Sequence, residues 1–175
     1  MFEIICGNDF LFDGGIFTCT FYCRTETGAF PDAAWTDFAA TVLDGWADAL
    51  LAVADRKQAG FRLLFADGPF RIDGVKTGER AALFFRRWDG DFSSARTLFT
   101  AEFPFAELLE AVRKAALRLC SALFLAGYGE DARKARARAL TKPTNAKIAP
   151  IKKKPEAIFA SGVSCTCILR SLTSM

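Results

Sequence analysis

The regular spacing of apolar side chains ends near residue 131, and this boundary limits what the chain can fold into. Up to residue 131 the chain carries 13 Lys and Arg against 19 Asp and Glu, a net charge of −6, whereas residues 132–175 carry ten against one, a net charge of +9. A segment with many charges and no apolar periodicity buries too little surface to fold. The sequence therefore predicts a globular domain over residues 1–131 and a flexible, disordered basic tail over residues 132–175.

Several short runs in the globular part predict strands. Residues 2–6 form an apolar run, and residues 16–24 alternate between an apolar and a polar face. Four later runs are separated by Asp-Gly pairs, which between apolar segments are typical of tight hairpins. The runs are residues 61–65, 70–73, 80–88 and 95–103, and the expected turns are Asp67-Gly68, Asp73-Gly74 and Asp89-Gly90.

Two segments carry apolar residues at helical spacing. The first covers residues 35–53, with Asp32 as the expected N-cap. The second has Pro104 in its expected first turn, and Gly127 and Gly129 are expected to end it. Together these patterns predict an α+β fold, in which a mostly antiparallel sheet of about five to six strands carries two amphipathic helices packed on one face.

The apolar runs are too short for a membrane span, which needs roughly 18 uninterrupted apolar residues. The first residues also lack the basic segment with which a secretory signal begins. We therefore expect a soluble, cytoplasmic protein with no membrane partner. In that compartment thiols stay reduced, so the six cysteines do not predict a disulfide framework.

The chain contains no histidine, and this absence removes the most common general base and most catalytic triads. No glycine-rich phosphate loop or G-x-S-x-G motif occurs either. Cys19 and Cys23 share a strand face but lie roughly 13 Å apart at about 3.3 Å per residue, too far to hold one metal ion. We predict no catalytic residue, no metal site and no cofactor, and leave open an enzyme that uses carboxylates, Lys or Cys.

Four aspartates fall on one side of the first predicted helix. At 100° per residue, Asp37, Asp44, Asp48 and Asp55 lie within about 20° of one direction, opposite the apolar face. No Lys or Arg interrupts this acidic stripe before Arg56. The stripe has two interpretations, a solvated helix face or a docking surface for a basic protein.

The tail over residues 132–175 also has two interpretations. Its Lys and Arg could contact phosphates, which would make the protein associate with nucleic acid. Its only aromatic residue is Phe159, so base stacking is not provided for and such binding would be unspecific. The other interpretation is a solvated tail without a partner.

The layout of residues 1–130 resembles that of small bacterial immunity proteins from polymorphic-toxin systems, in particular the wall-associated toxin immunity family. The resemblance rests on the N-terminal strands, on Trp35-Thr36-Asp37-Phe38 and Trp46 in the first helix, on the 65–70 turn Phe-Ala-Asp-Gly-Pro-Phe, and on Phe105-Ala106-Glu107-Leu108-Leu109. It implies a non-enzymatic binding protein that neutralises a basic toxin, here through its acidic surface. The alternative hypothesis is a nucleic-acid-associated protein that acts through its tail. The sequence predicts no oligomeric state.

Overall fold

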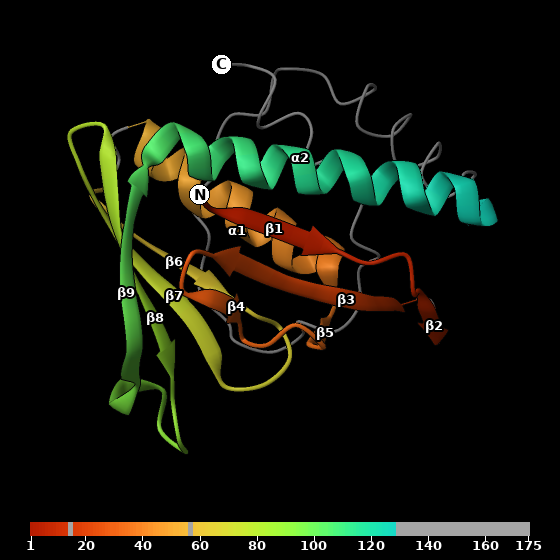
Figure 1. The fold of residues 1–175 in the computed structure, drawn as a ribbon, viewed down its shortest axis with the longest axis horizontal. Helices are drawn as coiled ribbons and strands as arrows, with labels where there is room; N and C mark the ends of the chain where they lie inside the picture. Colours follow the sequence, from red (N-terminus) through yellow and green to blue (C-terminus); the bar gives the residue numbers. More distant parts are fainter. Residues whose placement is uncertain (14–15, 56–57, 129–175) are drawn as a thin grey trace, which may run out of the picture.

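The computed structural model describes residues 1–13, 16–55 and 58–128, and confirms the α+β class with antiparallel sheets and two helices (Figure 1). The predicted tail, residues 132–175, lies outside the described residues. The strands divide between two sheets, where the sequence patterns predict a single one. Neither described helix is long and apolar enough to cross a membrane.

The first sheet is built around the long strand β3 (Ile16–Thr25). Its partners are all antiparallel: β1 (Glu3–Cys6), β2 (Leu11–Asp13), β4 (Gly28–Phe30) and β5 (Thr36–Asp37). Cys23 and Arg24 pair with β1 on one edge of β3 and with β4 on the other. Both edges of β3 are therefore occupied at that point, and the later strands form a second sheet.

The second sheet is an antiparallel meander in the order β6 (Gly60–Leu64), β7 (Phe70–Thr77), β8 (Arg80–Arg87) and β9 (Arg96–Pro104). The predicted turn at Asp73-Gly74 is wrong, because both residues lie inside β7 and the β7–β8 turn instead contains Gly78, with φ of 59°. Gly74 faces the ring of Phe61, and a Cβ there would come within 2.1 Å of a ring atom. Close packing of a ring, and not a turn, requires the glycine.

Helix α1 spans Ala39–Ala54, four residues later than its predicted start. Trp35 and Asp32 therefore precede the helix, and the predicted N-cap at Asp32 is wrong because Phe38 occupies that position. The backbone N–H of Phe21 donates to the carbonyl of Trp35 at 2.8 Å, and β5 pairs with β3. This pairing keeps the segment extended although its apolar spacing fits a helix.

Helix α2 spans Phe105–Leu123, and Pro104, which was predicted in its first turn, instead ends β9 and is the N-cap of the helix. A short π-helical segment (Phe124–Tyr128) follows it, in which Gly127 has a φ of 89° and leaves the helical conformation. In Figure 1, α2 runs along the first sheet, and α1 lies between α2 and β6. The two helices also pack on each other.

Aromatic rings join the layers of the core. Trp46 of α1 packs edge-on against Phe21 of β3 and against Phe65, with ring centroids 5.5 and 5.2 Å apart. Phe30 of β4 meets Phe85 of β8 in the same manner at 5.1 Å. Edge-to-face contacts of this kind add to the stabilisation from burial alone.

Candidate functional site

The second sheet has an apolar inner face and a charged outer face. Its inward side chains are buried: Phe61, Leu63, Ile72, Leu83 and Phe85. Because side chains alternate along a strand, the residues between them lie on the opposite face. That outer face carries a group that we call the arginine cluster: Arg62 on β6, Arg71 and Asp73 on β7, and Arg86 on β8.

Three guanidinium groups converge on one carboxylate in the arginine cluster. The strand register places Asp73 opposite Arg62, and Arg71 opposite Arg86. Arg62 Nε lies 2.8 Å from Asp73 Oδ1, whereas Arg71 Nε and Arg86 Nη1 lie 3.2 and 3.3 Å from Asp73 Oδ2. One carboxylate cannot neutralise three cations, so the cluster keeps an excess of positive charge.

The β8–β9 loop is fastened to the arginine cluster by Arg71. This side chain is only 5% exposed, and its Nη1 donates to the carbonyl of Phe92 at 2.8 Å. Its guanidinium also lies 4.2 Å from the centroid of the Phe92 ring, within the range of a cation–π contact. Arg62 approaches the same ring at 5.0 Å. The loop therefore holds an aromatic ring beside the cations.

Apolar side chains surround the cluster and remain accessible. Leu64 is 44% exposed, Val75 46% and Phe92 38%. Leu64 pairs with Arg71 across the strands, and Val75 follows Asp73 by two residues, so both share the outer face. Arginines and aromatic rings among exposed apolar groups are the composition that protein interfaces favour.

The four predicted acidic residues do not form one stripe. Asp37 is 1% exposed and belongs to β5, away from the outer side of α1. Asp44 and Asp48 do lie on α1, where burial raises the pKa of Asp44 and the Asp48 carboxylate raises it further. Asp55 is the C-cap of α1 and is exposed. Because α1 begins at Ala39, Asp37 precedes it and does not belong to the exposed face of the helix.

Asp37 instead holds the β6–β7 loop. Its Oδ1 accepts from the backbone N–H groups of Phe38 at 2.7 Å and Asp67 at 3.1 Å. Its Oδ2 accepts from the N–H of Ala66 at 3.2 Å and from the Trp35 indole at 3.3 Å. Burial raises the pKa of Asp37, and the hydrogen bonds offset part of that shift. With four donors and a position in the core, this carboxylate has a structural role.

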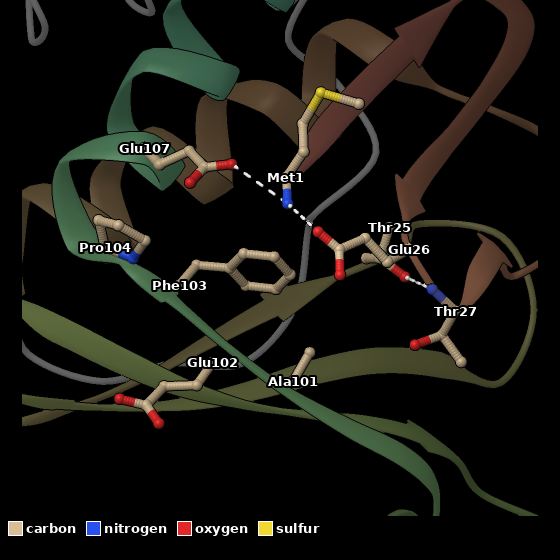
Figure 2. Close-up of a pocket in the computed structure, with 9 residues that line it drawn as sticks. All are labelled: Met1, Thr25, Glu26, Thr27, Ala101, Glu102, Phe103, Pro104 and Glu107. Atoms are coloured by element: carbon tan, nitrogen blue, oxygen red, sulfur yellow. Dashed lines mark hydrogen bonds and ion pairs between the residues drawn. The ribbon is translucent and has the colours of Figure 1, made fainter.

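A pocket of about 250 Å³ lies between β9, the β3–β4 turn and the start of α2 (Figure 2). Three carboxylates line it, and each has a partner. Glu26 and Glu107 face the amino group of Met1, at 3.2 and 4.0 Å, and Glu102 pairs with Arg80. The pocket's carboxylates are therefore engaged within the chain itself.

Within the described segments, Cys6, Cys19 and Cys23 are thiols and not part of a disulfide. Burial raises the pKa of Cys6 and of Cys19 to about 12, and that of Cys23 well above its usual range. Thiols of this kind are poor nucleophiles near neutral pH. Residues 1–13, 16–55 and 58–128 also contain no group of three or more Cys, Asp or Glu that could hold a metal ion.

No protein-family model, curated protein or solved structure matches the chain. The resemblance to toxin-immunity proteins therefore stays a prediction. The arginine cluster is a feature that sequence analysis missed. Its signal is the presence of arginines on the non-core side of three predicted strands, where residue 62 alternates with Phe61 and Leu63.

Proposed function

We propose that this protein is a non-catalytic protein-binding domain, and that the outer face of the β6–β9 sheet is its binding surface. The observation that carries the proposal is the convergence of Arg62, Arg71 and Arg86 on the single carboxylate of Asp73, beside exposed apolar side chains. The partner is a protein whose surface presents carboxylates among apolar groups, because such a surface complements both the excess charge and the exposed Leu64 and Val75.

Two features favour an acidic protein over a nucleic acid as the partner. Residues 1–131 carry a net charge of −6, which repels a nucleic acid, charged at every phosphate, more strongly than a protein that presents a few carboxylates on one face. The arginine cluster is also bordered by aliphatic Leu64 and Val75, which suit apolar packing more than phosphate contact. The alternative of nucleic-acid binding concerns residues 132–175, which lie outside the described residues.

An immunity protein that neutralises a toxin is one form that a non-catalytic binding domain takes, and we retain it within this proposal. The acidic surface that we predicted for a basic toxin is reduced to Asp44 and Asp48 on α1, together with Asp55 at its end. The arginine cluster instead favours an acidic partner. The two surfaces predict opposite charges on the partner, and charge-reversal variants distinguish them.

Charge reversal in the arginine cluster should weaken capture of the partner. We expect the full chain to retain a protein from native cell extract, and the Arg62→Glu/Arg86→Glu variant to bind that protein at least about tenfold more weakly. The matched control is Arg113→Glu, because Arg113 pairs with Glu110 on α2, away from this sheet. The measurement is affinity for the purified partner by calorimetry, at two salt concentrations.

Two results would contradict the proposal. The first is equal affinity of the wild type and the Arg62→Glu/Arg86→Glu variant, with both folded by circular dichroism. The second is loss of binding only in Asp44→Lys/Asp48→Lys, which would place the interface on α1 and make the partner basic.

A further inference from the structure

The Asp73 carboxylate is fully paired without Arg86. Arg62 Nε contacts Oδ1 at 2.8 Å, and Arg71 Nε contacts Oδ2 at 3.2 Å, so each oxygen has a guanidinium partner of its own. Arg71 is also committed to the Phe92 carbonyl. Two of the three cations are therefore sufficient to neutralise and hold the carboxylate, and Arg86 is surplus.

Arg86 is the least engaged cation of the cluster. Its contact with Asp73 is a 3.3 Å approach of Nη1 to Oδ2, the oxygen that Arg71 already holds. Its buried Nε–H has no acceptor among the described residues. A buried donor without an acceptor costs free energy. The side chain is 30% exposed and rests over the Phe84 ring, with 5.5 Å between guanidinium and centroid, so it can reach a ligand at the surface.

We infer that Arg86 receives an oxyanion, a carboxylate or phosphate group, at the outer face of the sheet. The Nε–H and one Nη–H on the same edge of its guanidinium can donate two parallel hydrogen bonds to the two oxygens of such a group. This bidentate arrangement is stronger than a single hydrogen bond between neutral groups. When the guanidinium of Arg86 rotates off Asp73 toward solvent, the Nε–H that is buried in this conformation becomes accessible and pairs with the oxyanion, and Asp73 keeps both of its other partners. The inference rests on the proposed function in that the oxyanion belongs to a side chain of the protein partner.

Inorganic phosphate is the probe that tests this assignment. In the full chain at constant ionic strength, the Nε–Hε signal of Arg86 in ¹H–¹⁵N spectra should shift and saturate as phosphate replaces chloride. Arg86→Met should weaken phosphate binding at least about tenfold, as followed by the remaining cluster signals. Arg80→Met is the matched control, because Arg80 lies on the same strand but pairs with Glu102. It should bind phosphate like the wild type.

A second arm distinguishes a partner's carboxylate from a free oxyanion. If phosphate weakens the complex of the wild type with its partner, but not the residual complex of Arg86→Met, then the partner's carboxylate occupies the site. If phosphate binds at Arg86 and leaves the complex unchanged, then the site takes a free oxyanion, and only the protein-binding proposal loses support. Absence of a saturable Arg86 response in the folded wild type, or equal phosphate binding by Arg86→Met, would overturn the inference.

Discussion

Trp46→Ala should lower the free energy of unfolding by about 3 to 5 kcal/mol. Trp46 is 1% exposed and contacts the rings of Phe21 and Phe65, so its removal leaves a large cavity between α1 and the two sheets. Its indole N–H also donates to the carbonyl of Leu64 at 2.6 Å, which fastens α1 to β6. Denaturation by guanidinium chloride, followed by circular dichroism, measures the loss.

Trp46→Phe separates the hydrogen bond of Trp46 from its packing, and Trp88→Ala is the matched control for the loss of a tryptophan. Trp46→Phe keeps most of the ring but loses the hydrogen bond to Leu64, and we expect a smaller loss of about 1 to 3 kcal/mol. Trp88→Ala removes a tryptophan that is half-buried in the β8–β9 loop and packs on Phe92, so it should cost less than Trp46→Ala. Equal losses for Trp46→Ala and Trp88→Ala would show that the core is not organised around Trp46.

Asp37→Asn should also destabilise the fold, with an expected loss of about 2 to 4 kcal/mol in the free energy of unfolding. All four groups that contact Asp37 are donors, from Trp35, Phe38, Ala66 and Asp67. An asparagine amide would point its own donor at two of them and leave them unsatisfied in the core. Urea denaturation at pH 7 measures this loss.

Asp48→Asn is the matched control for Asp37→Asn, because Asp48 is exposed on α1. It should change the free energy of unfolding by less than about 0.5 kcal/mol. If the two substitutions had the same small effect, Asp37 would not hold the β6–β7 loop, and its place in the acidic surface would have to be reconsidered.

The class of the fold could be predicted because local patterns decide it. Residues 61–63 alternate Phe, Arg, Leu, and the structure buries Phe61 and Leu63 while it exposes Arg62. The second helix, Phe105–Leu123, also lies over the segment whose apolar residues recur at helical spacing. Such features need only the chain's own periodicity, and therefore they are visible before any tertiary contact is known.

The errors arose where distant residues decide the local conformation. Asp37 fits a helical stripe by spacing, but pairing with β3 and hydrogen bonds from Ala66 and Asp67 hold it in a strand. Gly74 follows Asp73 as in a turn, but the Phe61 ring opposite it requires a glycine within β7. In both cases a contact remote in sequence outweighs the local preference.

The arginine cluster could not be predicted for a related reason. Arg62, Asp73 and Arg86 are separated by 11 and 13 positions in the chain, and only the register of β6, β7 and β8 brings them together. A shift of one residue in either pairing would move the partners to opposite faces of the sheet. Charge position along the sequence therefore does not reveal which cations share a carboxylate.

Oxidative footprinting of the full chain, with and without its bound partner, tests most directly whether the outer face of the β6–β9 sheet is the binding surface. We expect the partner to protect Leu64, Val75 and Phe92, which are all accessible in the free protein, and to leave the exposed Leu117 of α2 unchanged. Unchanged labelling of Leu64, Val75 and Phe92 in the complex, or protection confined to α1 around Asp44 and Asp48, would contradict it.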